Sequence, residues 1–413
     1  MEVRRGYKHT DVGAIPDAWR VATLGEICTF ENGDRSSNYP SPGSFVTSGI
    51  PFVNAGHVAD GKIHLGEMNY ITPQAYSRLG GGKLRPGDIL FCLRGSLGKF
   101  GIVPANFGDG AIASSLVIVR PKTAIAAREY LGCYFGSALC VRMIENWSGG
   151  AAQPNLGAQD LAKFLIPLPD TEFEQLVVAE ALSDADALIE SLEQLLTKKR
   201  QIKQGAMQEL LTGKKRLPGF EVEPGYKQTE VGAIPKDWAA CSLDVLSTMK
   251  SGESITSTNI DQSSPFPCFG GNGLRGYTTR FTHEGEYSLI GRQGALCGNV
   301  VGVRGQFFAS EHAIVVTPLA STDIRWLGSV LGAMNLNRYS ESSAQPGLSV
   351  AKILSLTVAA PSTREEQTAI ADILSDMDAE IMALDTKLAK ARQVKQGMMQ
   401  ELLTGRIRLV SGR

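Results

Sequence analysis

The stretch Gln208-Glu-Leu-Leu-Thr-Gly213 occurs a second time, unchanged, as Gln400-Glu-Leu-Leu-Thr-Gly405. These copies end a longer duplication, in which residues 174–217 and 366–409 align without a gap and are identical at 26 of 44 positions. The two copies are offset by 192 residues. A repeat of this length indicates that one structural unit occurs twice in the chain.

A second repeated stretch opens each half of the chain. Gly6-Tyr-Lys-His-Thr-Asp-Val-Gly-Ala-Ile-Pro-Asp-Ala-Trp19 returns as Gly225-Tyr-Lys-Gln-Thr-Glu-Val-Gly-Ala-Ile-Pro-Lys-Asp-Trp238, at an offset of 219. The tripeptide Ala152-Gln-Pro154 returns as Ala344-Gln-Pro346, already at the offset of 192. About 27 residues were therefore gained or lost between the opening stretch and the tripeptide.

The blocks between the repeated stretches, residues 20–168 and 239–360, diverge in sequence. Both are rich in Gly, Pro, Ser and Asn between short apolar runs, such as residues 89–93, 115–119 and 313–317, which predicts short strands joined by many loops. Short helices are expected at 124–145 and 323–338. The expected fold class is α/β (α+β), with two versions of one domain.

The repeated stretches carry the apolar stripe of a long helix. Its members recur about every 3.5 residues, which is typical of the seam of a two-helix coiled coil. They are Ala185, Ile189, Leu192, Leu196, Lys199, Ile202 and Ala206, and then Met377, Ile381, Leu384, Leu388, Ala391, Val394 and Met398. A helix over 172–211 would be about 60 Å long. The alternative is a helix lying on a globular domain.

Charge predicts the orientation of the two helices. Residues 172–193 are acidic wherever they are charged, and residues 198–216 are basic with a single exception. The second copy has the same polarity, with acids over 365–385 and bases over 387–408, again with one exception. Antiparallel pairing sets each acidic half beside a basic half, whereas parallel pairing sets like charges together. We therefore predict an antiparallel pair.

Two related domains on such a pair could contact one DNA duplex at two points, separated by one or two helical turns of about 34 Å each. Because the domains differ in sequence, the two half-sites should differ as well. The pattern therefore predicts recognition of a split, asymmetric target.

The arrangement resembles the specificity subunits of type I restriction-modification systems over the whole chain. A variable block, a helix ending in Gln-Glu-Leu-Leu-Thr-Gly, a second variable block and a second such helix follow one another. The stretch Pro267-Cys-Phe-Gly-Gly-Asn-Gly273, with Gly276-Tyr277 after it, adds to the resemblance. The 27-residue difference between the blocks departs from a strict repeat, so their DNA contacts need not match residue by residue.

The resemblance implies that each variable block is a target-recognition domain for double-stranded DNA. It further implies that the helices dock two methyltransferase (modification) subunits, which restriction/translocase subunits join. S-adenosylmethionine, ATP and Mg would be bound by those partners, with no cofactor in this chain. The corresponding domain boundaries are 1–168 and 218–360 for the recognition domains, and 169–217 and 361–413 for the helices.

Composition agrees with a soluble protein of more than one domain. The chain has 413 residues, of which 43% are hydrophobic and 20% charged. No apolar run approaches the roughly 18 residues of a membrane span, and no apolar stretch follows the charged residues 1–5. We therefore expect a cytoplasmic protein with no membrane segment.

Cysteines, histidines and net charge exclude several kinds of site. The seven cysteines form no Cys-x-x-Cys pair, which favours reduced, buried thiols, and the five histidines are dispersed, so no metal ligand is assigned. The net charge of -1 argues against a strong DNA binder acting alone, because phosphate neutralisation supplies much of the affinity.

Enzyme motifs are nearly absent. Phe269-Gly-Gly-Asn-Gly273 matches the F-x-G-x-G loop of amino-methyltransferases, but the residues after it do not start a convincing helix and no N-P-P-[YF] motif occurs. P-loop and HExxH motifs are also missing. No catalytic residue is therefore assigned. The competing hypotheses are a single-chain methyltransferase or nuclease, a coiled-coil scaffold, and a specificity subunit of a related type II (IIB/IIG-like) system.

Hydrogen-bond donors on loops at strand ends are the candidates for reading DNA. Arginine pairs bidentately with guanine, and asparagine or glutamine with adenine. The candidates are Arg94, Ser96 and Lys99 in the first domain, and Asn272, Arg275, Arg292 and Gln293 in the second. Lys62, Lys83 and Arg85 could contact phosphates. The alternative for each is an ordinary solvated loop residue.

Overall fold

The computed structural model describes residues 5–122, 125–148, 155–294, 296–340 and 347–410, so both Ala-Gln-Pro tripeptides lie outside the described part. The chain divides into two compact units, Met1–Leu192 with Lys387–Arg413, and Glu193–Thr386. Each long helix starts in one unit and ends in the other. The domain boundaries drawn from the sequence instead keep each helix whole, and they stay a prediction.

The first unit contains two four-stranded sheets. One has the order β11 (Phe100–Ile102), β10 (Ile89–Cys92), β13 (Leu116–Pro121), β4 (Cys28–Asn32). The other has the order β12 (Ala111–Ile112), β6 (Ile50–Val53), β9 (Asn69–Ile71), β5 (Phe45–Val46). Its smaller elements are β1 (Tyr7–Thr10), β2 (Gly13–Pro16), β3 (Trp19–Thr23), α1 (Leu24–Ile27), η1 (Pro42–Ser44), η2 (Ala55–His57), β7 (Val58–Ala59), β8 (Lys62–Ile63), α2 (Pro73–Arg78), α5 (Ala158–Leu161) and β14 (Leu165–Pro169).

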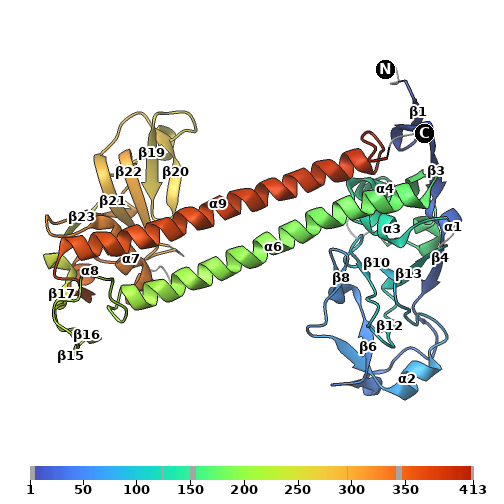
Figure 1. Ribbon diagram of the computed structural model, residues 1–413, viewed down its shortest axis with the longest axis horizontal. Coiled ribbons are helices and arrows are strands. Elements are labelled where there is room, and N and C mark those ends of the chain that lie inside the picture. Colours follow the sequence, from blue (N-terminus) through green and yellow to red (C-terminus); the bar gives the residue numbers. More distant parts are fainter. Residues whose placement is uncertain (1–4, 123–124, 149–154, 295, 341–346, 411–413) are drawn as a thin grey trace. The chain divides into compact units, whose positions relative to one another are not determined.

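Helices α3 (Arg128–Phe135) and α4 (Ala138–Ser148) pack beside the start of α6 (Glu172–Leu210) in this unit (Figure 1). Tyr130 and Leu131 of α3 share one hydrophobic core with Phe91 of β10 and with Val178 and Leu182 of α6. The helix expected over 124–145 is therefore two helices, α3 and α4, that meet at residues 136–137.

The second unit contains one six-stranded sheet. Its order is β18 (Ser247–Ser251), β23 (Ala313–Pro318), β21 (His283–Gly291), β22 (Val300–Ala309), β19 (Phe266–Gly270), β20 (Gly273–Thr278). Its helix α7 (Ile324–Ala333) packs in a core with residues of α9 (Arg364–Leu402), and α7 with η5 (Leu336–Tyr339) accounts for the helix expected over 323–338. The remaining elements are β15 (Tyr226–Thr229), β16 (Gly232–Pro235), β17 (Ala239–Ser242), η3 (Leu243–Val245), η4 (Ser257–Asn259), α8 (Val350–Leu354) and β24 (Thr357–Ala360).

The two units are versions of one fold. The order β4-β13-β10-β11 matches β18-β23-β21-β22, and all these neighbours are antiparallel. In the first unit β12 pairs in parallel with β6. In the second unit the end of β22 pairs with β19 in the same parallel way. The backbone oxygens of Leu93 and Arg292 accept bonds from Leu156 and Leu348, at 3.1 and 3.0 Å. Leu93 and Arg292 are therefore equivalent positions.

The extra residues of the first unit lie largely between β6 and β10. Pro51 pairs with Tyr70 across β6 and β9, as Pro267 pairs with Tyr277 across β19 and β20. Two residues join β19 to β20, whereas η2, β7 and β8 lie between β6 and β9. Helix α2 then follows β9, while residues 279–282 lead directly from β20 to β21.

The long helices α6 and α9 run antiparallel within each unit (Figure 1), as their charges predict. Each has 39 residues, which gives a length of about 58 Å. Lys203 pairs with Asp378 in the second unit, and Lys395 with Asp186 in the first. The 192-residue repeat relates the two pairs to each other, because it aligns Lys203 with Lys395 and Asp186 with Asp378.

One position of the predicted stripe differs in both helices. Ile202 and Val394 are 47% and 48% exposed, whereas the side chains of the neighbouring Lys203 and Lys395 are only 23% and 26% exposed. The lysine stems lie along the apolar surface while their amines reach the paired carboxylates. The prediction that Ile202 and Val394 lie in the seam was therefore wrong.

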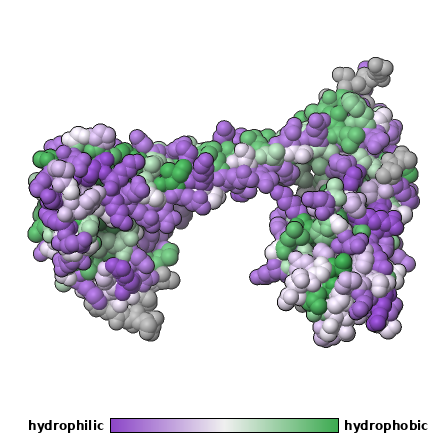
Figure 2. All heavy atoms as spheres, turned by 60° about the horizontal axis from the view of Figure 1, so that its bottom comes forward, coloured by the Kyte–Doolittle hydropathy of each residue, from purple (hydrophilic) through white to green (hydrophobic). Residues whose placement is uncertain are grey.

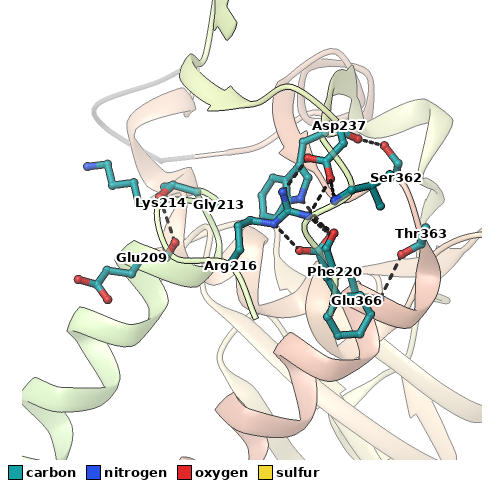
Figure 3. Close-up of polar contacts among 12 residues, drawn as sticks. Glu209, Gly213, Lys214, Arg216, Phe220, Asp237, Ser362, Thr363 and Glu366 are labelled. Carbon is teal, nitrogen blue, oxygen red and sulfur yellow. Dashed lines mark hydrogen bonds and ion pairs between the residues drawn. The ribbon is translucent and has the colours of Figure 1, made fainter. Parts of the chain in front are cut away.

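A cluster around Arg216 connects three segments of the second unit (Figure 3). The guanidinium donates to Asp237 Oδ1 at 2.7 Å and to Glu366 Oε1 at 2.8 Å, and also to the oxygen of Phe220. Trp238 Nε1 donates to Glu366 Oε2 at 3.1 Å. We call Arg216, Asp237, Trp238 and Glu366 the Arg216 clasp. It fixes the start of α9 to the segment that follows α6.

The first unit has a reduced version of this clasp. Arg408 donates to both oxygens of Glu174, at 2.7 and 2.8 Å, as Arg216 does to Glu366. However, Ala18 stands where the second unit has Asp237. Among the described residues, the buried Trp19 Nε1 finds no hydrogen-bond partner.

Candidate nucleic-acid interface

In the second unit, two loops meet at one end of the sheet. Residues 292–299 connect β21 to β22, and Gly271 with Asn272 connects β19 to β20. A Cβ added to Gly291 would lie 2.2 Å from the oxygen of Gly271, so only glycine allows this approach. The two loops therefore form a single surface.

This surface brings together the four candidates predicted for the second domain. Asn272 and Gln293 are exposed on the two loops, and Arg275 is exposed on β20, with its side chain against Gly270. Arg292 is half-buried, and its Nη1 donates to the hydroxyl of Ser251 at 3.1 Å. The first three present their polar groups to solvent, whereas Arg292 also braces the loop.

The stretch that matches a methyltransferase loop lies on the same surface. Residues 269–273 form the end of β19, its turn and the start of β20, so a strand and not a helix follows the glycines. The strand–loop–helix context that a cofactor loop needs is therefore missing at this stretch.

In the first unit, the corresponding loop is residues 93–99 between β10 and β11. Arg94 and Lys99 are exposed, and Ser96 is half-buried. Gly95 and Gly98 have φ values of +76° and +86°, which glycine adopts without strain. The structure thus places the three candidates of the first domain on one tight loop.

The equivalence of the two loops in the structure differs from the one that their sequences suggest. Both segments contain an arginine near the strand end, but Arg292 is equivalent to Leu93, and so Arg94 is equivalent to Gln293. Both Arg94 and Gln293 are exposed and each is followed by a left-handed glycine. The two units therefore present different side chains at the same position.

The three lysine and arginine residues suggested for phosphates lie elsewhere in the first unit. Lys62 pairs with Glu190 of α6 at 3.1 Å, and Lys83 Nζ lies 5.0 Å from the centre of the Tyr76 ring. Arg85 is exposed. The amines of Lys62 and Lys83 thus already contact other side chains of the protein.

Arg35 is a candidate that the sequence analysis missed. It is exposed just after β4, and its Nη2 donates to the oxygen of Ser114 at 3.2 Å. The next residue, Ser115, accepts a hydrogen bond from the nitrogen of Leu93. Arg35 therefore lies beside the loop of Arg94. The polar run 34–38 at a strand end was a signal that could have indicated it.

A network of charged side chains connects strands of the first unit. Arg120 of β13 donates to the buried Asp88 at 2.7 Å and also pairs with Glu31 of β4. Burial would raise the pKa of Glu31, but the Gly82 N–H and the Arg120 guanidinium together lower it. The network keeps Glu31 charged and fixes β4 to β13.

A groove of about 1240 Å³ lies on the first unit between α3, α4, the first half of α6 and the second half of α9. Its lining includes Val141 and Leu176, which are 49% and 40% exposed. Five acidic and three basic residues also line it, so the groove is partly apolar and mildly acidic. Figure 2 shows hydrophilic residues interspersed with hydrophobic ones on the surfaces of both units.

The described residues hold no group of three or more His, Cys, Asp or Glu that could bind a metal ion. Within the same ranges, no helix has the length and apolar character to cross a membrane. The seven cysteines are free thiols, and burial raises the pKa of Cys28, Cys92 and Cys140 to about 12, so these three stay protonated.

The family model of the type I restriction modification DNA specificity domain matches residues 16–204 and 235–392. The chain belongs to this family. The two matches fall on the two halves that the internal repeat relates, so the specificity domain occurs twice.

Relatives of the specificity family align with parts of this chain. The type I restriction enzyme EcoprrI specificity subunit of Escherichia coli is 46% identical over 157 residues, which are 37% of this chain and 38% of that protein. The MjaVIII specificity subunit of Methanocaldococcus jannaschii is 24% identical over 249 residues, 58% of this chain and 51% of that protein. The chain thus spans about two fifths to one half of these relatives.

Solved structures share the fold over nearly the whole chain. The type I restriction-modification S subunit from M. genitalium has a TM-score of 0.65 at 16% identity, covering 98% of both chains. A second structure, described for complex assembly and conformational transition of the type I R-M system, has a TM-score of 0.57 at 17% identity, covering 95% of this chain and 99% of the other. The chain thus shares the fold of these two structures over nearly its whole length.

Proposed function

We propose that the chain is the non-catalytic DNA-reading subunit of a type I restriction-modification complex. The observation that carries this proposal is the pair of equivalent, exposed positions Arg94 and Gln293 on two versions of one fold. Arginine suits the paired acceptors of guanine, and glutamine the donor and acceptor of adenine. The two units would then read different half-sites of one asymmetric duplex.

Each unit would present one loop surface to the duplex. Arg94, Ser96 and Lys99 serve the first half-site, and Asn272, Arg275, Arg292 and Gln293 the second. Arg292 acts partly by holding its loop, because it also bonds Ser251.

The partners would be two methyltransferase subunits, joined by restriction/translocase subunits in the cytoplasm. The groove beside α6 and α9 supports docking on the first unit, because Val141 and Leu176 expose apolar surface there. S-adenosylmethionine, ATP and Mg would belong to those partners. The net charge of -1 agrees with a complex in which the partners supply part of the DNA affinity.

Sequencing of methylated bases in host DNA tests this proposal. Cells that carry the chain with its methyltransferase partner should show methylation at one two-part motif, which is lost when the chain is deleted. The purified chain alone should neither methylate nor cut DNA. Unchanged methylation after deletion would refute the proposal.

Exchange of residues 20–168 for the block of a relative is the matched test of modularity. It should change the first half of the motif and leave the second half intact. A change in both halves would show that the units do not read DNA independently.

A further inference from the structure

The loop that follows β4 presents a row of exposed polar side chains. Residues 35–39 are all exposed and comprise Arg35, Ser36, Ser37, Asn38 and Tyr39. Their guanidinium, hydroxyl and amide groups are all hydrogen-bond donors. None of these residues belongs to the loop of Arg94.

The base of this loop is fixed at two points. Gly33 is buried, and a Cβ there would lie 2.8 Å from the oxygen of Ala113, so β4 and the turn before β13 are in close contact. The carboxylate of Asp34 accepts from the nitrogen of Ser36 at 2.7 Å and from that of Gly80 at 2.8 Å. The backbone that carries Arg35 is thus held before any ligand arrives.

The Arg35 side chain is itself oriented. Its Nη2 donates to the oxygen of Ser114 at 3.2 Å, which leaves other N–H donors of the planar guanidinium for a ligand. A flexible cation suits a phosphate, but a braced guanidinium presents its fork in one direction and loses less entropy on binding. This favours the paired acceptors of a guanine edge.

The second unit has a different residue at the position equivalent to Arg35. Gly252 makes the same close approach as Gly33, so Glu253 is equivalent to Asp34 and Ser254 to Arg35. Glu253 is paired with Arg280 at 2.8 Å. A serine therefore replaces the arginine.

The tight turn that carries Asn272 in the second unit has no equivalent between β6 and β9 of the first. Its longer connection from β6 to β9 crosses to β11, where Gly61 donates to the oxygen of Phe100 and accepts from the nitrogen of Ile102. Lys62 of the same connection pairs with Glu190. In the first unit, exposed hydrogen-bond donors lie instead on residues 35–39.

We propose that Arg35, held by Asp34 and Ser114, is a second base-reading residue of the first unit and specifies a guanine in the first half-site. The proposal rests on the function proposed above. It makes the first half-site depend on two arginines, Arg35 and Arg94, from two loops that meet at residues 114–115.

The test uses the full chain in complex with its methyltransferase subunits. Arg35→Ala should relax one position in the first half of the methylated motif, with discrimination against the wrong base falling roughly 10-fold or more, and should leave the second half unchanged. Arg35→Lys should not restore that position, because an amine lacks the fork. Ser254→Ala, at the equivalent place in the second unit, is the control and should leave the motif unchanged.

Arg35→Gln keeps the test decisive if the alanine variant does not fold. This variant should shift the preference at the same position from guanine towards adenine. An unchanged motif, or an equal loss of affinity for every sequence with a smaller salt dependence, would overturn the proposal. If the wild-type complex methylates no two-part motif, the proposed function fails instead.

Discussion

At the residue scale, Asp237 distinguishes the Arg216 clasp from its counterpart in the first unit. The hydrogen bond and charge of Arg216 hold the pKa of Asp237 below its ordinary value. A carboxyl whose pKa is lowered by folding stabilises the folded state above its ordinary pKa, near about 4, and loses this contribution as the pH falls. The first unit has Ala18 at this position and lacks the contribution.

We therefore predict that acid loosens the two clasps unequally. Between about pH 5 and pH 3, hydrogen exchange of β15 and β16, corrected for its intrinsic pH dependence, should become faster in the wild type. In the Asp237→Asn variant the same amides should exchange faster already at pH 7 and change less with acid. An acid response of β15 and β16 as large in the variant as in the wild type would contradict this prediction.

At the element scale, one glutamine near the start of each long helix connects that helix to its unit. Gln175 and Gln367 are 1% and 3% exposed. Their Oε1 atoms accept from the nitrogens that precede α3 and α7, those of Ala127 and Asp323, at 2.7 and 2.9 Å. Each Nε2 donates to a proline oxygen six residues earlier. The repeat thus conserves a buried polar junction between α6 or α9 and the shorter helix beside it.

Gln367→Leu should destabilise the second unit by about 1–3 kcal/mol, because it leaves a buried N–H and a buried carbonyl oxygen without partners. Hydrogen exchange of the α7 amides measures this loss. Gln194→Leu, at an exposed site of α6, is the control and should change the same amides by no more than about 0.5 kcal/mol. Equal effects of the two substitutions would show that the junction is not stabilising.

The elements that the sequence predicts best are those with long periodic patterns. Local spacing predicts the helices α6 and α9, their acidic and basic halves and their antiparallel pairing. Each helix has 39 residues, so the spacing pattern repeats many times along it. Ile202 and Val394 were misplaced because the pattern ranks side chains by hydropathy, whereas a lysine can bury its stem and pair its amine. The short apolar runs of the variable blocks predicted only the fold class and not the order of the strands.

The candidate surface was predictable only in part, because long-range hydrogen bonds decide it. Residues Asn272 and Arg292 come together through a glycine contact between two loops, which the strand-end positions anticipate. The equivalence of Arg94 with Gln293 depends on bonds to residues more than 50 positions away. Arg35 lies in a polar run at a strand end that the sequence shows, but its contact with Ser114, 79 residues away, could not be predicted from that run.

At the scale of the whole molecule, segments far apart in the sequence, around Tyr7 and Gly405, contact each other in the first unit. The Tyr7 hydroxyl donates to the oxygen of Gly405 at 3.0 Å, as the Tyr226 hydroxyl donates to that of Lys214 at 3.0 Å. Gly405 has a φ of +68°, and a Cβ there would lie 2.5 Å from the ring of Pro16. The segment after α9 thus packs on β1 and β2 as the segment after α6 packs on β15 and β16.

A chain that ends at Leu402 should therefore lose stability in the first unit alone. Glu174 is 4% exposed and would lose Arg408, and the loss of a partner from a buried ion pair costs roughly 3–5 kcal/mol. Hydrogen exchange should become faster in β1, β2 and α3 and stay unchanged in the six-stranded sheet of the second unit. Arg406→Ala, at an exposed site of the same segment, is the control and should have little effect. Because the second unit keeps its own clasp, equal loosening of both units would mean that they do not fold as separate bodies around the repeated frame.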